Sequence, residues 1–386
     1  MARVQTGLDV LSEKPLRSLG DARVGVLCHQ ASVDSSLRHI VPLFSAHQVR
    51  ITALFAPEHG FWGTAQDQVP IPSEKTHVPV HSLYGDKRAP SADMLSDVDV
   101  LVCDLQDVGS RYYTFVWTMS LAMQACAKLG KKFIVLDRPN PINGITLEGP
   151  VLDPNFASFV GLYPVPVRHG LTIGEMAQWI NEGLGVGTDL EVVRMKGWRR
   201  SMYFEETGVP WVLPSPNMPT VETAVVYPGG CLIEGTNLSE GRGTTHPFEM
   251  LGAPFINPDA LLERLARAKL PGVRFRACRF EPTFHKFKGE SCGGVQIHVT
   301  NRKIFKSFLT TLAVIQAIRE LYPSAFAWRD PPYEYETEKL PFDILCGTDG
   351  VRQTIENGKP VQSLEKEWDG QCAAFARERR PFLLYN

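Results

Sequence analysis

The sequence lacks an excess of charge of either sign, and it lacks long hydrophobic runs. Its 40 Lys and Arg against 42 Asp and Glu give a net charge of -2. Without a block of like charge, neither nucleic acid nor an anionic membrane is expected as a partner. No stretch reaches the roughly 18 apolar residues that a membrane span requires, and the first 14 residues contain no signal-like apolar stretch. We therefore expect a cytoplasmic protein with a small-molecule ligand, or a periplasmic or secreted one if a signal sequence has been removed.

The sequence also lacks the spacing patterns of metal, disulfide and dinucleotide sites. Its eight cysteines are scattered without a Cys-x-x-Cys pair, and several lie in apolar segments such as 101–103. We predict that they are reduced packing residues, and we predict no metal and no cofactor. A Gly-x-Gly-x-x-Gly motif does not follow the first predicted strand, where Cys28-His29-Gln30-Ala31-Ser32 stands instead. A dinucleotide ligand is therefore not expected.

The first half of the chain repeats one unit, an apolar run followed by a segment with helical spacing of apolar residues. Runs that are apolar throughout are typical of strands covered on both faces, which indicates a doubly wound parallel sheet with helices on each side. The predicted strands are 23–28, 50–55, 98–104, 132–137, 165–167 and 190–195, and the predicted helices are 118–129 and 173–182, the latter with Thr172 as its N-cap.

The second half begins with a change of composition, because residues 211–227 are rich in proline. Beyond them the pattern predicts a helix over 258–269, a strand over 295–299 and an amphipathic helix over 303–321. A chain of 386 residues that is 44% hydrophobic is long enough for two domains. We place the boundary near residue 230, which gives a parallel-sheet domain over 1–229 and a smaller α/β domain over 230–386 that closes the cleft.

Polar side chains gather where the predicted strands end. Glu58 and His59 follow the second strand, and the segments 104–113 and 137–141 follow the third and fourth. Ligands bind at the carboxyl ends of parallel strands. Carboxylates, amides, an arginine and phenols together suit the hydroxyl groups of a sugar or polyol. Each cluster alone has a structural interpretation as a helix cap, an ion pair or packing, and it is their convergence that favours a site.

Two loops and one short motif are further candidates. Residues 213–219 contain three prolines, and residues 234–245 combine glycines with carboxylates and an arginine. A cluster of solvated turns is the alternative interpretation of the second loop. A strand end followed by a helix cap is the alternative for Arg168-His169-Gly170.

These motifs together resemble the exo-β-N-acetylmuramidase family. The resemblance runs from Gly7 to the C-terminus and rests on six ordered segments, namely Ala-Pro-Glu-His-Gly-Phe-Trp-Gly (56–63), Asp-Leu-Gln-Asp-Val-Gly-Ser-Arg-Tyr-Tyr-Thr (104–114), Leu-Asp-Arg-Pro-Asn-Pro-Ile (136–142), Arg-His-Gly-Leu-Thr-Ile-Gly-Glu (168–175), Pro-Ser-Pro-Asn-Met-Pro (214–219) and Glu-Gly-Thr-Asn-Leu-Ser-Glu-Gly-Arg-Gly-Thr (234–244). It implies a bacterial glycosidase that removes N-acetylmuramic acid from the non-reducing end of peptidoglycan fragments during cell-wall turnover and recycling. It also implies a Rossmann-like N-terminal domain, a smaller C-terminal α/β domain and a site in the cleft between them.

The resemblance makes Glu58, in the Glu-His-Gly motif, the leading catalytic residue. Cleavage of a glycosidic bond usually needs an acid and a second group that supports an oxocarbenium-like centre, and we predict that Glu58 is the acid. His59 either relays a proton or is a structural histidine. The second group stays open between the substrate's own 2-acetamido oxygen and the carboxylates Asp104, Asp107, Asp137, Glu234 and Glu240.

The substrate carries a lactyl carboxylate, for which a guanidinium group is the natural partner because it forms two parallel hydrogen bonds. Arg111, Arg168 and Arg242 are the candidates. The complete predicted site has Glu58, His59 and Asp104 as catalytic residues, and its substrate-binding residues are Gln106, Arg111, Tyr112, Asp137, Arg138, Asn140, Arg168, His169, Asn217, Glu234, Asn237, Glu240 and Arg242.

One segment departs from the family pattern, and two other functions compete. Cys28 to Ser32 stand where relatives carry Thr-Asn-x-Thr/Ser-Gly, so His29 changes a substrate contact if that asparagine touches the sugar. The first alternative function is a non-catalytic muropeptide-binding or sensing protein on the same scaffold. The second, an ester or amide hydrolase, lacks a Gly-x-Ser-x-Gly or Ser-x-x-Lys motif.

Overall fold

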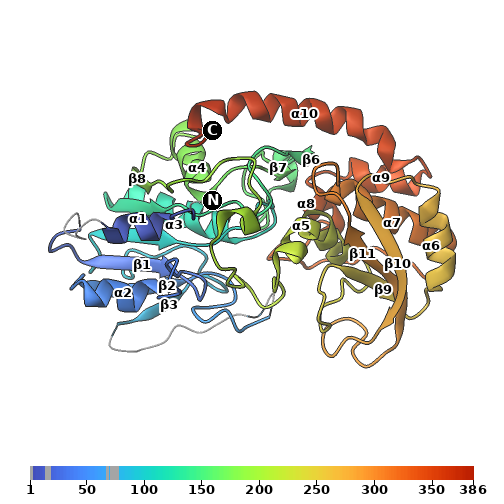
Figure 1. Cartoon of the computed structure of the whole chain (residues 1–386), viewed down its shortest axis with the longest axis horizontal. Coiled ribbons are helices and arrows are strands. Elements are labelled where there is room, and N and C mark those ends of the chain that lie inside the picture. Colours follow the sequence, from blue (N-terminus) through green and yellow to red (C-terminus); the bar gives the residue numbers. More distant parts are fainter. Residues whose placement is uncertain (1–2, 14–18, 67–68, 70–77) are drawn as a thin grey trace.

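The computed structural model describes residues 3–13, 19–66, 69 and 78–386, and it shows two α/β units side by side (Figure 1). The N-terminal unit is built on a six-stranded parallel sheet of order β3-β2-β1-β4-β5-β8. Its strands are β1 (Val24–Cys28), β2 (Ile51–Ala56), β3 (Val80–Ser82), β4 (Val100–Asp104), β5 (Lys132–Leu136) and β8 (Asp189–Val193).

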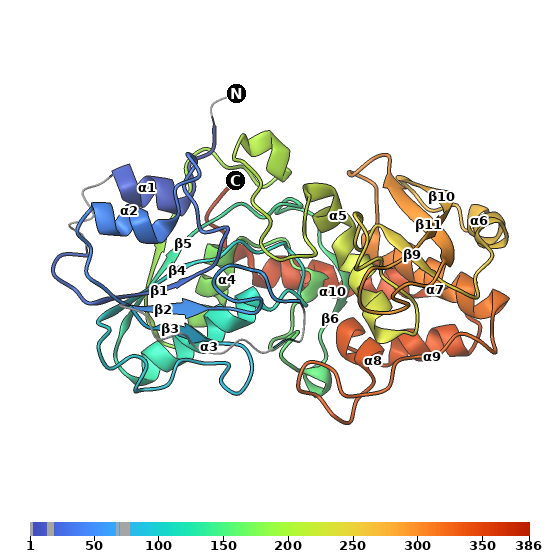
Figure 2. The ribbon, with the colours of Figure 1, turned by 90° about the horizontal axis from the view of Figure 1, so that it is seen from below.

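Helices cover both faces of this sheet because alternate residues of each strand point to opposite sides. Leu27 and Leu101 belong to the core on one face, and Val26 and Val102 belong to the core on the other. Figure 2 shows α1 and α2 on one side of the strands and α3 on the other. The doubly wound arrangement is as predicted, and its flanking helices are α1 (Gly7–Glu13), α2 (Ile40–Ala46), α3 (Phe115–Lys128) and α4 (Ile173–Gln178).

Helix α4 begins as predicted, since the Thr172 side chain accepts a hydrogen bond from the Glu175 N–H within a capping box. The segment predicted as a parallel strand at 165–167 is β7 (Pro166–Arg168), which pairs antiparallel with β6 (Glu148–Val151) in a separate sheet. Its predicted place in the main sheet is wrong, because β8 occupies the free edge of β5.

The C-terminal unit is built on a three-stranded antiparallel sheet of order β10-β11-β9. Helix α5 packs against α7 of this unit, and the predicted boundary near residue 230 falls at the end of α5. The elements are α5 (Val221–Gly230), β9 (Met250–Ala253), α6 (Pro258–Ala266), β10 (Val273–Phe280), β11 (Cys292–Val299), α7 (Ser307–Leu321), α8 (Pro341–Cys346), α9 (Gly350–Glu356) and α10 (Glu365–Glu378).

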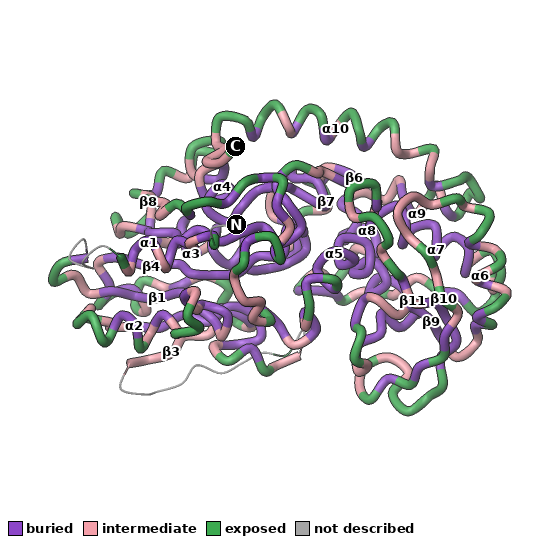
Figure 3. Tube along the Cα trace, in the orientation of Figure 1, coloured by how far each residue is buried: buried purple, intermediate pink, exposed green. Residues whose placement is uncertain are grey.

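Helix α10 returns from the C-terminal unit and packs on β6, so that the chain ends beside α4 (Figure 1). The segments between the two units, including β7 and α5, are buried (Figure 3). All eight cysteines are buried free thiols, which confirms the prediction that they are packing residues. None of the helices in the described ranges is long and apolar enough to cross a membrane.

Candidate active site

A cavity lies between the two units, beside the carboxyl end of β2, and its empty space of about 430 Å³ includes volume that is open to solvent. Both halves of the chain contribute to its wall, which is rich in carboxylates and phenols and includes the amide of Asn217. This composition suits a ligand with many hydroxyl groups. The lining residues are Glu58, His59, Tyr112, Tyr113, Thr114, Val160, Ser215, Asn217, Met218, Tyr227, Glu234, Arg242, Phe248, Tyr333 and Glu334.

Glu58 is placed by the tight turn that follows β2. The Gly60 N–H donates to the Pro57 carbonyl at 3.1 Å, and Gly60 has a φ of 81°. The Thr114 hydroxyl donates to Glu58 Oε2 at 2.7 Å. Thr114 is the N-cap residue of α3 but makes no side-chain cap bond, so its hydroxyl holds Glu58 rather than the helix. Glu58 is 6% exposed, and it is therefore a fixed, largely buried carboxyl group at the wall of the cavity.

His59 lines the cavity next to Glu58 and is anchored on one side of its ring. Its Nδ1 lies 2.9 Å from the Ala65 carbonyl oxygen, and because a carbonyl only accepts, Nδ1 carries the proton. In the neutral ring Nε2 is then an acceptor. The hydrogen bond of Nδ1 to the backbone fits the interpretation of His59 as a structural histidine. A role of His59 as a proton relay stays a prediction.

Glu234, Glu240 and Arg242 form a buried ion-pair network. Arg242 Nη2 lies 2.7 Å from Glu234 Oε1, and Arg242 Nε lies 3.2 Å from Glu240 Oε1. Lys286 and His285 approach Glu240 at 3.1 and 3.2 Å. Burial raises the pKa of Glu240, but the positive charge of Lys286, the hydrogen bond from His285 and the positive charge of Arg242 together outweigh burial and hold its pKa below the usual value. Glu234 and Arg242 reach the cavity wall, whereas Glu240 lies behind them.

The proline-rich loop 213–219 brings Asn217 to the cavity, as predicted. Asn217 Nδ2 donates to Gln66 Oε1 at 2.7 Å. The base of the loop is held by the segment that follows β1, because Gln30 Nε2 donates to the Leu213 carbonyl at 2.8 Å and His29 Nδ1 lies 3.3 Å from the Pro214 carbonyl.

His29, the departure from the family pattern, is a fully buried support of this loop. Its Nε2 accepts the Gln106 N–H at 3.1 Å, which leaves Nδ1 as the donor to Pro214. Burial, helped by the positive charge of Arg138, lowers the pKa of His29 to about 3. His29 is therefore neutral, and within the described part of the chain it does not border the cavity.

Four predicted site residues at the ends of β4 and β5 bind one another or the backbone. Arg138 binds both oxygens of Asp104 at 2.6 and 2.7 Å. Asn140 Nδ2 donates to a backbone carbonyl at 2.9 Å, and Gln106 Nε2 does the same at 2.7 and 2.9 Å. Contrary to prediction, none of these four residues belongs to the cavity wall as the described part of the chain forms it. The reason is that they fasten the loops after neighbouring strands to each other.

Asp137 lies in the same layer. It accepts the Thr172 hydroxyl and the Gly174 N–H at 2.8 Å each, together with the Tyr385 hydroxyl at 2.6 Å. Burial raises the pKa of Asp137 to about 7, although these hydrogen bonds stabilise the ionised carboxylate and act to lower the pKa. Asp137 therefore ties α4 and the C-terminal tail to β5, and this position contradicts the expectation that it faces the ligand.

Arg111 and Arg168 donate hydrogen bonds to backbone carbonyls, and neither belongs to the described wall of the cavity. Arg111 donates to the carbonyls of Pro150 and Leu345 at 2.9 and 2.8 Å. Burial lowers the pKa of Arg111 to about 10. Arg168 donates to the Ile142 carbonyl. Of the three predicted arginines, Arg242 is the one that the described cavity wall includes, and its role in binding a carboxylate stays a prediction.

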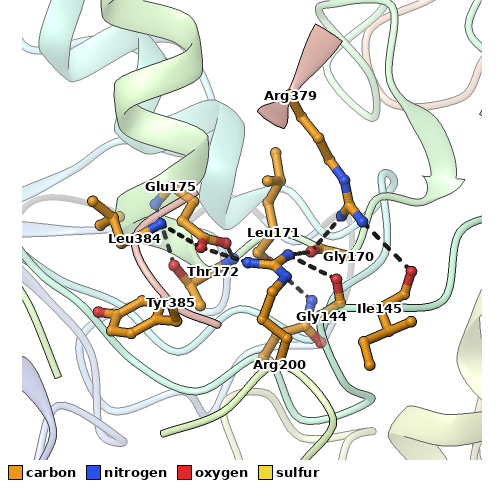
Figure 4. A network of polar contacts seen from close by, with 12 residues as sticks. Gly144, Ile145, Gly170, Leu171, Thr172, Glu175, Arg200, Arg379, Leu384 and Tyr385 are labelled. Carbon is orange, nitrogen blue, oxygen red and sulfur yellow. Dashed lines mark hydrogen bonds and ion pairs between the residues drawn. The ribbon is translucent and has the colours of Figure 1, made fainter. Parts of the chain in front are cut away.

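His169 is also structural. Its Nε2 lies 3.3 Å from Asp107 Oδ2. Figure 4 shows Arg200 and Arg379 converging on the carbonyl of Gly170, and Arg379 also donates to the His169 carbonyl at 2.9 Å. The alternative interpretation of this motif, a strand end followed by a helix cap, describes its geometry.

Tyr112 and Asn237 complete the predicted set. Tyr112 borders the cavity, but its hydroxyl donates to the Pro228 carbonyl. Asn237 donates to the Ala325 carbonyl at 2.8 Å and accepts the Ala327 N–H at 3.0 Å. Tyr112 thus shapes the wall of the cavity, and Asn237 fastens its own loop to the segment after α7.

Two family models match the chain, the N-terminal part of the exo-β-N-acetylmuramidase NamZ over residues 24–222 and the C-terminal part over 225–385. The chain belongs to the exo-β-N-acetylmuramidase family. The peptidoglycan β-N-acetylmuramidase NamZ of Bacillus subtilis (strain 168) is 47% identical over 387 residues, which cover 99% of this chain and 92% of the relative.

Two solved structures of DUF1343 family proteins from Bacteroides fragilis NCTC 9343 have the same fold. The first has a TM-score of 0.90 and 34% identity, with 100% of both chains covered. The second has a TM-score of 0.78 and 29% identity, with 100% of this chain and 99% of that chain covered. The predicted family, the two-domain α/β fold and the glycoside hydrolase class are confirmed.

Part of the cavity wall of this exo-β-N-acetylmuramidase family member was not predicted from the sequence. Glu334 and Tyr333 come from the segment between α7 and α8, for which no site residue was predicted. The Tyr333 hydroxyl donates to Glu234 Oε2 at 2.7 Å. A usable signal was the alternation Tyr-Glu-Tyr-Glu over 333–336. The other missed lining residues are Tyr113, Thr114, Val160, Ser215, Met218, Tyr227 and Phe248.

Proposed function

We propose that this chain is an exo-acting β-N-acetylmuramidase that hydrolyses the terminal non-reducing N-acetylmuramic acid of peptidoglycan fragments, with Glu58 as the general acid. The observation that carries the proposal is the position of Glu58, a largely buried carboxyl group that lines the cavity and is held by Thr114. Similarity to the Bacillus subtilis muramidase over nearly the whole chain supports the reaction class.

The cavity supports the chemistry in two ways. Glu58 can pass a proton to the glycosidic oxygen as the bond to the anomeric carbon breaks, which removes the need to expel an alkoxide. Asn217, Glu234 and the surrounding phenols offer donors and acceptors to the sugar hydroxyls. A cavity lined by side chains of both units suits the terminal sugar of a fragment better than the middle of a long glycan, in keeping with exo action.

The biological setting is part of the proposal. A disaccharide or muropeptide with N-acetylmuramic acid at its non-reducing end would be the substrate, and cell-wall turnover and recycling would use the released sugar. The cytoplasmic location expected from the sequence stays a prediction, which cell fractionation with an antibody against the chain tests.

A chromogenic N-acetylmuramide tests the function most simply. We expect the purified chain to release the chromophore with saturation kinetics, and to release N-acetylmuramic acid from a disaccharide that carries it at the non-reducing end but not from one that carries it at the reducing end. Saturable binding of the muramide without turnover would instead support the muropeptide sensor.

A further inference from the structure

Glu334 enters the cavity from the C-terminal unit, whereas Glu58 enters it from the N-terminal unit. We infer that Glu334 is the second catalytic carboxylate, the anion that stabilises the positive charge developing at the anomeric carbon while Glu58 protonates the leaving oxygen. This inference rests on the proposed function and adds the group that the sequence left open.

Contacts across the two units hold Glu334 in place. The Tyr84 hydroxyl, from the segment after β3, lies 3.2 and 3.1 Å from the two carboxylate oxygens of Glu334. Tyr84, Phe159 and Tyr335 pack as a trio of rings with centroids 6.0, 5.7 and 5.8 Å apart. Glu334 itself is 8% exposed. The C-terminal segment is therefore docked on the N-terminal unit at the point where it delivers this carboxylate.

The backbone at Glu334 is strained. Tyr333 and Glu336 exchange N–H to carbonyl hydrogen bonds at 2.8 and 2.9 Å, and the two residues between them, Glu334 and Tyr335, have φ angles of 46° and 69°. A two-residue turn with both φ values positive favours Asn and Gly. Side chains persist in such a conformation where the surrounding structure holds them, and this pattern clusters at functional sites.

Glu58 and Glu334 act on the same phenols, which places them in one small site. Burial raises the pKa of Tyr84, and the negative charges of Glu58 and Glu334 raise it further. Burial likewise raises the pKa of Tyr335, and the same two carboxylates add to the effect. Both carboxylates line the same cavity, and this shared wall places them beside one ligand space.

The third glutamate of the cavity is less suited to the role. The guanidinium of Arg242 lies 2.7 Å from Glu234, and its positive charge offsets that of the carboxylate. The Tyr84 hydroxyl donates to the carboxylate of Glu334 and so orients it at the cavity wall.

The reaction divides the work between the two carboxyl groups. Glu58 transfers its proton to the glycosidic oxygen, and the bond from that oxygen to the anomeric carbon breaks with its electron pair on the oxygen. Positive charge then builds on the sugar beside the Glu334 carboxylate. Water adds to the anomeric carbon and loses a proton to solvent, from which Glu58 is reprotonated.

The dependence on the leaving group separates the two roles. A dinitrophenyl N-acetylmuramide needs little protonation of its leaving group, whereas a methylumbelliferyl one needs more. We expect Glu334→Gln to lower kcat by about 10² to 10³-fold on both substrates, because a charge stabiliser is needed whatever leaves. We expect the defect of Glu58→Gln to shrink on the dinitrophenyl substrate, because an acid is then less important.

Two further variants separate a loss of catalysis from a loss of folded structure. Asn tolerates the left-handed conformation, so Glu334→Asn should keep or raise Tm while it loses kcat to a similar extent. Glu338→Gln removes an exposed carboxylate from the same segment and should keep the wild-type kcat. Near wild-type kcat in Glu334→Gln, or a defect confined to KM, would overturn the inference. Wild-type chain that turns over neither muramide would overturn the proposed function itself, and this inference with it.

Discussion

Arg242 borders the cavity while its guanidinium already binds two glutamates. Glu234 and Glu240 carry two negative charges against the single positive charge of Arg242, and Lys286 supplies a second positive charge 3.1 Å from Glu240. A lactyl carboxylate that enters would meet a guanidinium whose position these partners fix, and a prepositioned guanidinium can bind a carboxylate through two parallel hydrogen bonds. At the scale of single residues, we therefore expect Arg242 to provide the selectivity for the muramic acid side chain.

Replacing Arg242 by Lys tests this role, since Lys keeps the charge but loses the paired N–H groups. We expect wild-type chain to prefer an N-acetylmuramide over the matching N-acetylglucosaminide by about 10³-fold in kcat/KM. The variant should reduce this ratio by about tenfold or more, mainly through slower cleavage of the muramide. The measurement is kcat/KM on both sugars, with the exposed Arg267→Lys as the control. An unchanged ratio in the Arg242 variant would contradict the role.

At the scale of elements, the loop 213–219 shows how an irregular segment is given a fixed position. Its prolines restrict its backbone, but its place depends on Gln30 and His29, which reach its carbonyls from the end of β1. His29 also accepts the Gln106 N–H. One neutral imidazole therefore joins β1, the segment after β4 and the loop that carries Asn217.

We expect acid to lower the stability of the folded chain through His29. The pKa of His29 is about 3 in the folded chain against an ordinary value of 6.5, so below pH 6.5 the unfolded chain takes up a proton that the folded chain does not. The contribution of His29 to stability is thus complete above pH 6.5 and is lost as the pH falls towards 3. Between pH 7 and pH 4.5 the loss amounts to about 2 to 3 kcal/mol.

The measurement is urea unfolding of wild-type chain and His29→Gln at pH 7 and pH 4.5. Glutamine offers a donor and an acceptor but does not titrate. The free energy of unfolding of wild-type chain should fall by about 2 kcal/mol more than that of the variant. The exposed His47→Gln serves as the control and should behave like wild-type chain. Equal losses in wild-type chain and His29→Gln would show that His29 titrates normally.

At the scale of the whole molecule, the two units enclose the cavity together, and this arrangement explains what the sequence could predict. Strands β1, β2, β4 and β5 were predictable because they are largely apolar runs, whereas the short β3 was not predicted. Glu58 was predictable because its motif directly follows β2. Glu334 was not, because it reaches the cavity through contacts with Tyr84 from a distant part of the chain.

The polar residues after β4 and β5 show a second limit of the sequence. Asp104 is the last residue of β4 and Glu58 follows β2, yet Asp104 is fully buried against Arg138 and Glu58 lines the cavity. Composition does not distinguish a carboxylate that pairs with a buried cation from one that faces a ligand. That difference depends on which side chains the fold brings opposite each other.

The most direct test of the account is kcat of Glu58→Gln on a methylumbelliferyl N-acetylmuramide, measured across pH. Glutamine keeps the size of the side chain and can still accept the Thr114 hydroxyl bond, but it supplies no proton. We predict a fall in kcat of about 10²-fold or more, with Tm close to that of wild-type chain. The exposed Asp86→Asn should leave kcat unchanged. Near wild-type kcat in Glu58→Gln at every pH would contradict the account, because Glu58 would then not be the acid.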